Sequence, residues 1–412
     1  MRTALIIGGG VVGLTAALQL QQQGLAVTLV DPEALPRPAS WGNAGHIAIE
    51  QVAPLASIRT LLDAPRHLLS HDGLLSLPIR DLGAWAPFGL ELIGASMPSR
   101  FAAGQLALTH LLREALPAWR RLTSGLRRPD LLRENGHYLV WEKAATARNA
   151  QRVLLSREAP TVTYRDPDPK ERDRIAELIG REPAGILHCE GSAQVTHIAE
   201  LMAALQAAFV SAGGAPLRTT AIALQIEGGR TVAVLKDRTT ATADLVVVAA
   251  GVGSRRLLSR LGQRVPLIAE RGYHLHARTH RWPEGLPSVT FEDRSLFVTP
   301  FRDGLRASSF LEFSRPDRPA DPRKWRRLRA HLTELNLPAE EPLSEWMGSR
   351  PTLPDYLPAV GRSHLAPNLI YAFGHQHLGL TLAPITAELV GALALGAKPP
   401  VAVEPFDLDR FS

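Results

Sequence analysis

The stretch ALIIGGGVVGLTAALQLQQQGLAVTLVD, residues 4–31, decides the fold of this 412-residue chain. Residues 4–7 are apolar and suit a short buried strand, and residues 11–23 carry apolar side chains at helical spacing. Residues 25–30 predict a second buried strand, which ends at Asp31. The order strand, glycine-rich turn, helix, strand and acid predicts a dinucleotide-binding unit.

Three glycines in this stretch form the G-x-G-x-x-G pattern. Gly8 permits the tight turn, Gly10 lets the backbone approach a pyrophosphate, and Gly13 lets the helix pack close to the strand. The free N–H groups at the start of the helix then face the phosphates. The carboxylate of Asp31 suits the ribose hydroxyls and repels a 2′-phosphate, so the stretch favours FAD or NAD over NADP.

The composition is that of a soluble globular protein of two or three domains, with 45% hydrophobic and 21% charged residues. The net charge of +6 suits an anionic partner such as a membrane surface or a nucleotide, but the excess is spread along the chain. No feature points to a nucleic acid as partner. The basic run 323–329 is interpreted as a solvated helix face, with membrane or partner docking as the alternative.

Cysteine content and apolar runs indicate the compartment. The single cysteine, Cys189, excludes a disulfide within the chain, thiolate zinc sites and iron–sulfur clusters. The apolar run before the first glycines is too short for a signal peptide, and no run reaches about 18 apolar residues. We expect a cytoplasmic protein, with peripheral membrane association as the alternative.

A second group of motifs lies toward the C-terminus. Residues 245–255, LVVVAAGVGSR, predict a buried strand that ends over the cofactor, and residues 369–373 predict another. The turn GHQHLGLT, 374–381, follows, and a helix begins near residue 380. Its two histidines suggest a metal site, a catalytic dyad or cofactor support. No third ligand follows at metal-like spacing, so we expect no metal site.

These motifs together resemble those of FAD-dependent D-amino acid dehydrogenases, which belong to the wider D-amino acid oxidase and glycine oxidase superfamily. The resemblance spans nearly the whole chain. The version FGHQHLGLT is most similar to the D-hydroxyproline dehydrogenases within that group. The motifs that carry it are the N-terminal fingerprint, SWGNAGH (40–46), VVVAAGVGS (246–254), SRPTLPDYLPAVG (349–361) and GHQHLGLTLAP (374–384).

The resemblance implies an α/β fold with two interleaved domains. The Rossmann-like FAD-binding domain would take residues 1–60, 190–265 and 345–412. An α+β substrate domain, built on an antiparallel sheet, would take residues 61–189 and 266–344. Local patterns agree, with strands predicted at 136–143 and 294–314 and helices at 106–126 and 322–335.

The resemblance also implies non-covalent FAD. Relatives with attached FAD use a histidine just before the AG segment, where this chain has Trp41-Gly42-Asn43, or a cysteine near the C-terminal Arg-Pro. The helix near Gly379 would point its N-terminus at the flavin and stabilise negative charge there. The expected FAD contacts are Gly8, Gly10, Val11, Val12, Gly13, Asp31, Pro32, Ser40, Asn43, Ala44, Gly45, Ile222, Ala250, Gly251, Gly374, Leu378, Gly379, Leu380 and Thr381.

The resemblance points to four candidate residues for the chemistry, since relatives hold the substrate carboxylate with an arginine at the Arg-Pro motif and often with a tyrosine near residue 273. Arg350 would clamp the substrate carboxylate with its planar guanidinium, the alternative being an ion pair with Asp355. Tyr273 would touch the same carboxylate, the alternative being a core tyrosine, with Arg271 a weaker choice. His46 would orient the substrate amine or take its proton, and His375 could do the same; each could instead be structural.

The reaction implied is hydride transfer from Cα of a D-amino acid to flavin N5, with cis-4-hydroxy-D-proline or D-proline giving a cyclic imine. The electron acceptor would be a respiratory-chain component or an artificial dye rather than NAD. Alternatives are a broad D-amino acid dehydrogenase, a glycine/sarcosine-type oxidase, or a non-catalytic electron-transfer subunit, and partner subunits are plausible. Two departures from the family, VTHIAEL (195–201) and RASSFLEF (306–313), put the substrate in more doubt than the reaction.

Overall fold

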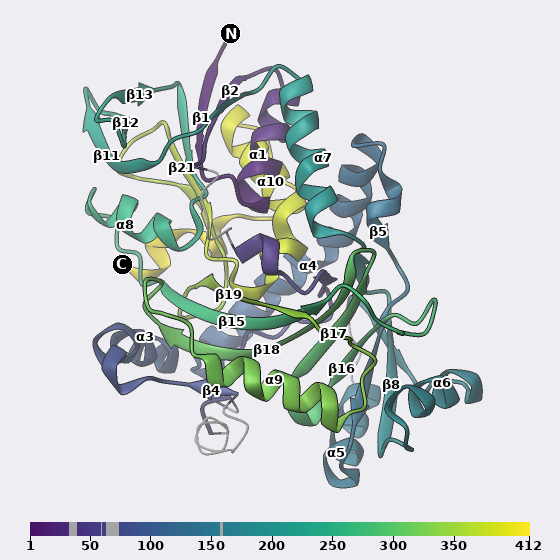
Figure 1. Ribbon diagram of the computed structural model, residues 1–412. Coiled ribbons are helices and arrows are strands. Elements are labelled where there is room, and N and C mark those ends of the chain that lie inside the picture. The colour runs from purple at the N-terminus through teal and green to yellow at the C-terminus, as the bar shows by residue number, and fades with distance from the viewer. Residues whose placement is uncertain (33–38, 59, 63–73, 157–159) are drawn as a thin grey trace.

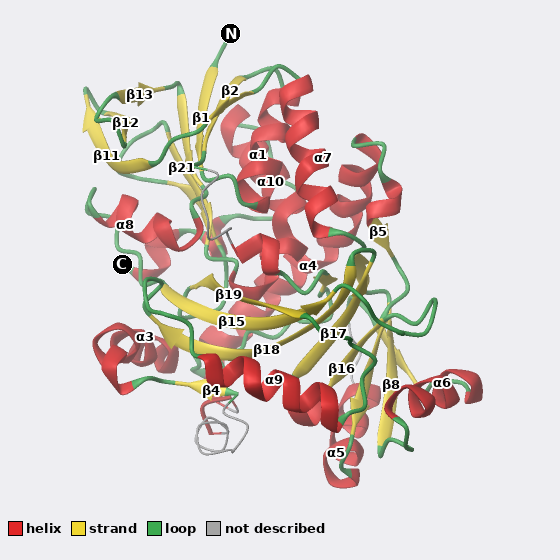
Figure 2. Ribbon diagram, in the orientation of Figure 1, coloured by secondary structure: helices red, strands yellow, loops and turns green. Residues whose placement is uncertain are grey.

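The computed structural model describes residues 1–32, 39–58, 60–62, 74–156 and 160–412. Two large sheets organise these residues, one in the upper half of Figure 1 and one in the lower half. Helices cover the outer faces of both sheets (Figure 2). The N-terminal strand begins the upper sheet, and the chain later leaves this sheet and returns to it.

The upper sheet has six strands in the order β10-β2-β1-β14-β21-β20. All neighbours are parallel except β20 and β21, which are antiparallel. This is a doubly wound arrangement, in which a ligand binds beyond the carboxyl ends of the strands. The strands are β1 (Thr3–Ile7), β2 (Ala26–Val30), β10 (Ala215–Leu217), β14 (Leu245–Val248), β20 (Ala359–Arg362) and β21 (Leu369–Phe373).

Alternate side chains of the central strand β1 enter two different cores. Ala4 and Ile6 pack with three helices, α1 (Val11–Gln22), α7 (Ile198–Ser211) and α10 (Gly379–Leu395). Leu5 and Ile7 pack on the other face against a small sheet and a short helix. Those elements are β11 (Ala221–Glu227), β12 (Arg230–Leu235), β13 (Thr240–Thr242) and α8 (Ser254–Ser259). Burial on both faces explains why the strands are continuous apolar runs in the sequence.

The lower sheet has nine strands, and several of them line the cavity described below. Its order is β19-β15-β18-β17-β16-β6-β8-β7, with β4 paired to β18. The predicted antiparallel sheet is confirmed, with two parallel pairings, β16 with β6 and β18 with β4. The strands are β4 (Leu75–Ser76), β6 (His137–Trp141), β7 (Thr163–Arg165), β8 (Gly185–Glu190), β15 (Ile268–Ala277), β16 (Ser288–Phe291), β17 (Leu296–Phe301), β18 (Gly304–Ser314) and β19 (Leu343–Thr352).

Helix α9 (Pro322–Glu334) packs beneath strands β15 and β18 (Figure 2). The predictions of a hairpin over 294–314 and of a helix over 322–335 are confirmed by β17, β18 and α9. The helix predicted at 106–126 is longer in the structure, where α4 spans Pro98–Gly125. Its first turn contains a proline, a residue that suits the start of a helix. The remaining elements are α3 (Leu82–Ala95), α5 (Ala144–Ser156), α6 (Pro169–Ile179), β3 (His46–Ile47), β5 (Leu132–Arg133) and β9 (Ala193–Val195).

The place of strand β19 differs from the division of the chain that the sequence suggested. Strand β19 pairs with β15 along its whole length, from Leu343 to Thr352. Residues 345–352, which the sequence-based division assigned to the FAD-binding domain, therefore lie in the lower sheet. Strand pairing is long-range, so the local pattern could not place this boundary. The rest of the division stays a prediction.

In the described part of the chain, one helical segment, residues 376–395, is long and apolar enough to cross a membrane. Its window of highest hydropathy is 78% buried inside the protein. Helix α10, which forms most of this segment, packs against α1 and α4. We interpret it as a core helix.

Candidate active site

A cavity of about 2230 Å³ lies between the carboxyl ends of the upper strands and the lower sheet. Its lining runs from the glycine turn after β1 to strands β15, β17, β18 and β19. Pockets for one drug-sized ligand measure roughly 300–1,000 Å³. The cavity therefore has room for a dinucleotide and a substrate together.

The glycine turn has the close approaches that a dinucleotide-binding turn requires. Gly8 has φ +113°, and a Cβ atom there would lie 2.5 Å from the carbonyl oxygen of Ala249. A Cβ atom on Gly13 would lie 1.9 Å from the carbonyl oxygen of Gly8. A side chain at Gly8 would clash with the backbone that follows β14, and one at Gly13 would push α1 away from the turn after β1. Gly10 caps α1 and lines the cavity together with Val11 and Val12, so the start of the helix faces the cavity.

Two polar side chains hold this turn in place. The Asp31 carboxylate, at the end of β2, accepts a hydrogen bond of 2.6 Å from the backbone N–H of Gly9. The backbone N–H of Val11 donates to Ser40 Oγ at 3.1 Å. Both side chains line the cavity, where a ribose and a pyrophosphate would lie. The residues present therefore fit FAD.

The expected FAD contacts divide into those that line the cavity and those that lie behind the lining. Gly13, Gly45, Gly374, Leu378 and Thr381 are absent from the lining, and Thr381 instead accepts a hydrogen bond from the Ala48 N–H at 3.0 Å. Those that line the cavity are Gly8, Gly10, Val11, Val12, Asp31, Pro32, Ser40, Asn43, Ala44, Ala250, Gly251, Gly379 and Leu380.

The expected contact of Ile222 needs a correction. Ile222 does not line the cavity, whereas Thr219, Thr220 and Ala221 just before it do. Strand β11 begins at Ala221 and turns away from the cavity, with the Ile222 carbonyl accepting a hydrogen bond from Arg260 at 3.2 Å. A contact assigned by resemblance at the start of a strand is easily displaced by a residue or two.

The start of α10 supplies a positive electrostatic end to the cavity. Gly379 and Leu380, its first residues, line the cavity, and no side chain caps the helix. Free N–H groups and the helix dipole favour negative charge at this place. The turn GHQHLGLT therefore presents the end of a helix to the cavity, as expected for cofactor support.

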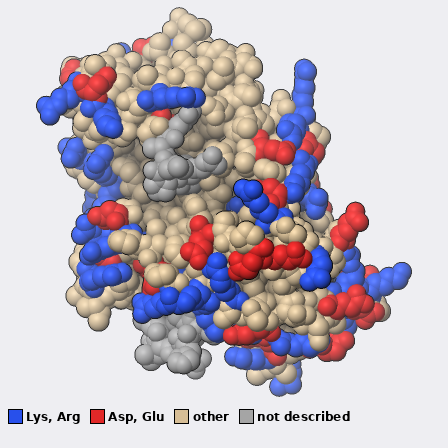
Figure 3. Space-filling view, viewed as in Figure 1, with Lys and Arg blue, Asp and Glu red and all other residues tan. Residues whose placement is uncertain are grey.

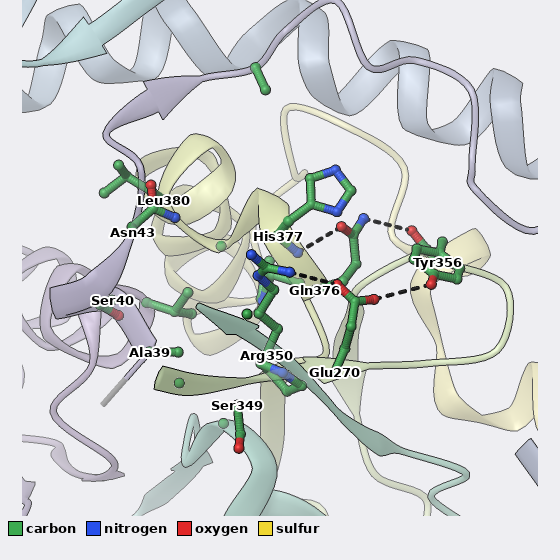
Figure 4. Close-up of a pocket in the computed structure, with 18 of the residues that line it drawn as sticks. Ala39, Ser40, Asn43, Glu270, Ser349, Arg350, Tyr356, Gln376, His377 and Leu380 are labelled. Atoms are coloured by element: carbon green, nitrogen blue, oxygen red, sulfur yellow. Dashed lines mark hydrogen bonds and ion pairs between the residues drawn. The ribbon is translucent and has the colours of Figure 1, made fainter. Parts of the chain in front are cut away.

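Arg350 lies at the floor of the cavity beside Glu270, its cross-strand neighbour on β15 (Figure 4). Nη1 of Arg350 donates to Glu270 Oε1 at 3.1 Å and to the Phe310 carbonyl at 3.4 Å. The guanidinium lies against Gly272, where a Cβ atom would be 2.3 Å from Nη2. Both hydrogen bonds that it makes within the described residues come from Nη1. Nη2 and Nε remain for a ligand, and 27% of the side chain is exposed.

Glu270 is fully buried and is held by three side chains. It accepts hydrogen bonds from Arg350, from Thr352 Oγ1 at 3.2 Å and from Tyr356 Oη at 3.1 Å. Burial, followed by the adjacent Glu270 charge, raises the pKa of Tyr356, which therefore stays a hydrogen-bond donor. The network fixes one edge of the Arg350 guanidinium and leaves the other edge facing the cavity. Asp355, the alternative partner, pairs instead with Arg410 at 2.6 Å.

Backbone strain concentrates around this cation. Phe310, Tyr356 and Gln376 have φ values of +72°, +58° and +42°, in the left-handed region that non-glycine residues avoid. All three line the cavity. The Gln376 amide donates to the Tyr356 carbonyl at 3.1 Å, which ties two of the strained turns together (Figure 4). Strain of this kind collects at functional sites.

His46, on β3, lines the cavity beside a buried carboxylate. Its Nε2 lies 2.8 Å from Glu50 Oε1. Burial would raise the pKa of Glu50, but His46 and then His137 lower it to about 2, so Glu50 is ionised at neutral pH. The His46 ring lies 4.5 Å from His137 and 4.8 Å from Phe297 between ring centroids.

The ligand atoms of His46, Glu50 and His137 lie within 4.8 Å of one another. Two imidazoles and a carboxylate are also a common metal set. Here the pair His46–Glu50 is hydrogen-bonded, and His137 Nδ1 lies 2.9 Å from Ser192 Oγ. Burial, followed by the electrostatic effect of the neighbouring His46 ring, lowers the pKa of His137 to about 3, so His137 is neutral. We interpret the group as a hydrogen-bonded pair beside a neutral histidine.

Tyr273 and Arg271 are hydrogen-bonded to each other and to neighbouring residues. The Tyr273 hydroxyl donates to Glu312 at 2.8 Å and accepts from Arg271 at 3.0 Å and from the Asp321 N–H at 3.1 Å. Its ring packs against Trp325 of α9, 5.4 Å between centroids. Tyr273 itself is one of the residues that line the cavity, while Arg271 is not. The Tyr273 hydroxyl is held by these three partners, and its expected role at the substrate carboxylate stays a prediction.

His375 lies in the cavity lining, but its imidazole is held by helix α10. Its Nε2 lies 2.9 Å from Thr386 Oγ1 of α10, and only 2% of the residue is exposed. Burial lowers its pKa to about 3, so the imidazole is neutral. We interpret His375 as a structural residue that fixes α10 to the turn before it.

Sequence reasoning missed Glu270, Tyr356 and Glu50. Glu50 follows His46 by four residues in HIAIE, a spacing that could have suggested the pair. Tyr356 lies inside the PDYLP motif. Glu270 had no local signal, because its role depends on the register between β15 and β19.

Comparison with known proteins agrees with this geometry. The family model described as FAD dependent oxidoreductase matches residues 3–393. The chain is 29% identical to a D-amino-acid oxidase of Bradyrhizobium diazoefficiens, over 100% of this chain and 99% of the relative. It is 27% identical to a D-amino acid dehydrogenase of Rhizobium johnstonii, over 99% of each.

Two solved structures share the fold. Glycine oxidase from Geobacillus kaustophilus gives a TM-score of 0.73 at 19% identity, over 99% of both chains. L-proline dehydrogenase from P. horikoshii gives a TM-score of 0.73 at 16% identity, over 100% of this chain and 97% of the other. The family match, the glycine turn and the size of the cavity converge: the chain is a flavoenzyme that belongs to the family of FAD-dependent oxidoreductases.

Proposed function

We propose that this enzyme dehydrogenates a D-amino acid, with a cyclic secondary amine, cis-4-hydroxy-D-proline or D-proline, as the favoured substrate. The observation that carries the proposal is Arg350, a cation at the floor of the cavity with one edge held by buried Glu270 and the other edge free. A guanidinium in this state suits a carboxylate. A flavoprotein that only carries electrons has no need of such a clamp.

The preference for the D-configuration rests on the relatives. A D-amino-acid oxidase and a D-amino acid dehydrogenase align with this chain over essentially their full lengths. The preference for a cyclic secondary amine rests on the similarity of FGHQHLGLT to the D-hydroxyproline dehydrogenases. A broader D-amino acid dehydrogenase is the second candidate, because the cavity of about 2230 Å³ does not restrict the substrate to a small ring.

Three groups of this chain take part in the proposed reaction. Arg350 binds the carboxylate and thereby orients Cα. The His46–Glu50 pair lies in the cavity lining and takes the proton of the substrate amine as the C–N bond gains double-bond character. The open N-terminus of α10 stabilises negative charge that develops next to it. Bound FAD supplies the acceptor for the hydride that leaves Cα.

The chain has one dinucleotide-binding unit, which FAD would fill. We therefore propose that the electrons pass to a respiratory-chain component, or to an artificial dye in vitro, rather than to NAD.

An anaerobic absorbance scan of the purified holoenzyme tests the substrate class. The enzyme is mixed in turn with cis-4-hydroxy-D-proline, D-alanine and L-proline. We expect prompt bleaching of the flavin band with the first compound, because its carboxylate reaches Arg350 with Cα oriented for hydride loss. Equal bleaching by D-alanine supports the broader dehydrogenase. A flavin that stays oxidised with all three contradicts the proposed substrate class.

A further inference from the structure

Helix α3 (Leu82–Ala95) exposes the face that most surface helices bury. Only Phe88 of this helix is fully buried. A stripe at helical spacing, Leu82, Leu90, Ile93 and then Met97, faces outward, with Leu90 73% exposed. A helix that borders solvent normally presents polar side chains there. The outer face of α3 is therefore unpaired apolar surface.

The apolar surface extends beyond the helix. Ile79, just before α3, is 87% exposed. The segment that contributes Ala56 to the inner side of α3 also exposes Leu55, Ile58 and Leu62. Eight of the fifteen exposed large hydrophobic residues in the described part of the chain thus lie between residues 55 and 97. We call Ile79, Leu82, Leu90, Ile93 and Met97 the α3 patch.

The charges around the α3 patch are positive. Arg80 and Arg100 are exposed and flank its two ends. The single acidic residue of α3, Glu91, pairs with Arg264 at 3.0 Å. In Figure 3 the lower left of the molecule shows tan surface with blue side chains and a smaller number of red ones beside it. Apolar side chains with flanking cations suit an anionic lipid surface.

The same charges argue against a second copy of the chain as the occupant. A symmetric dimer through the α3 patch would bring two sets of Arg80 and Arg100 into one interface. No unpaired carboxylate on α3 would be present to compensate them. Helix α3 also protrudes at the edge of the molecule (Figure 1), which suits contact with a broad surface.

The patch adjoins the active-site cavity. Leu92 of α3 and Leu55 of the neighbouring segment both line the cavity, and Leu55 is also exposed. A surface that covers the α3 patch would therefore lie next to this end of the cavity.

We propose that the α3 patch docks the enzyme onto the surface of an anionic lipid bilayer. The apolar stripe enters the interfacial region, and the arginines remain at the level of the lipid phosphates. The protein attaches peripherally, since the described helix long enough to span a bilayer, residues 376–395, is a core element. This inference goes beyond the proposed reaction, and lipid binding can be measured without any substrate.

Co-sedimentation of the full-length holoenzyme with vesicles tests the proposal. The vesicles are pure phosphatidylcholine or a mixture with phosphatidylglycerol. The test variant L90N/I93N removes two exposed side chains of the patch, and the matched control V210N/I226N removes two exposed apolar side chains elsewhere. Flavin absorbance and turnover with a soluble dye show that each variant is folded.

We expect the parent and V210N/I226N to bind the anionic vesicles and L90N/I93N to bind about tenfold less. R80Q/R100Q should lose affinity for anionic vesicles and not for neutral ones. A parent that ignores both vesicles, or an L90N/I93N variant that binds normally, overturns the proposal. A dimer in light scattering that L90N/I93N abolishes, without vesicle binding by the parent, assigns the patch to a second copy instead.

Discussion

Glu270 shows how a buried carboxylate can control a binding cation without touching the ligand. It holds one edge of Arg350 and is itself held by Thr352 and Tyr356. Its charge also compensates Arg350 before a substrate arrives. Glu270 is therefore a positioning residue. Its loss should disturb the orientation of the bound substrate more than the affinity of the enzyme for it.

We expect Glu270→Gln to lower the limiting rate of flavin reduction by about tenfold or more, because misplaced substrates react slowly. The apparent substrate Kd should change by less than about threefold, since the lost orientation is offset by the uncompensated charge on Arg350. Anaerobic stopped-flow absorbance separates the two quantities. Asp355→Asn, which disrupts the Arg410 pair outside the cavity lining, is the control. Reduction of the Glu270→Gln flavin at the parental rate would remove Glu270 from this role.

Residue identities in the site were partly predictable. Arg350 was singled out through the resemblance of its motif, RPTLPD, to the family, and the structure places it in the cavity lining. Tyr273 was given a substrate role for its type and place in the chain, yet its hydroxyl is bonded to Glu312 and Arg271. Glu270, three residues earlier, holds Arg350 in the cavity lining and was not predicted. Side chains alternate along a strand, and β15 has a register shift between Arg271 and Tyr273. No local pattern shows which side of such a strand meets the cavity.

The junction between β21 and α10 has two functions. It aims the start of a helix into the cavity, and it holds that helix through His375 and Thr386. His375 must stay neutral, because burial lowers its pKa to about 3. The junction should therefore weaken in acid.

The direction of the pH effect on stability follows from the difference between the folded and unfolded pKa of His375. Unfolded, His375 titrates near its ordinary pKa of 6.5, and folded it titrates near 3. Its contribution to stability is complete above pH 6.5 and is lost as pH falls from 6.5 toward 3. His375→Gln keeps a partner for Thr386 and removes this titration. Between pH 7 and 5.5, the free energy of unfolding of the parent should fall by about 1 kcal/mol more than that of the variant.

Urea unfolding curves at the two pH values measure this difference. Other titrating groups contribute equally to both proteins and cancel. If the free energy of unfolding falls equally for the parent and His375→Gln between the two pH values, the prediction is wrong. His375 would then be protonated, or solvated, in the folded protein.

Elements with strong local signals were predicted well. The unit β1–α1–β2 and the hairpin β17–β18 carry apolar periodicity and glycine turns, and the structure confirms both. The parallel pairing of β16 with β6 and the extension of β19 into the lower sheet were not predicted. Those features depend on contacts between segments far apart in the chain, which periodicity does not record.

The cavity forms where segments that are far apart in the chain fold next to one another. Its lining joins the glycine turn near residue 8, strand β15 near residue 270 and the turn near residue 376. The glycine turn and the turn near residue 376 were recognised as motifs in the sequence, whereas strand β15 was not predicted. That these segments meet was expected only through the family resemblance. The size of the cavity and the exposed face of α3 required the structure.

The central claim is that Arg350 binds the carboxylate of the substrate beside the flavin. The most direct test is anaerobic flavin reduction of the parent and Arg350→Ala by the best amino acid from the substrate screen and by its carboxamide. We expect the parent to prefer the acid strongly. We expect Arg350→Ala to retain its flavin, to need about 30-fold or more of the acid and to treat acid and amide alike. A variant reduced at parental concentrations of the acid would contradict the claim.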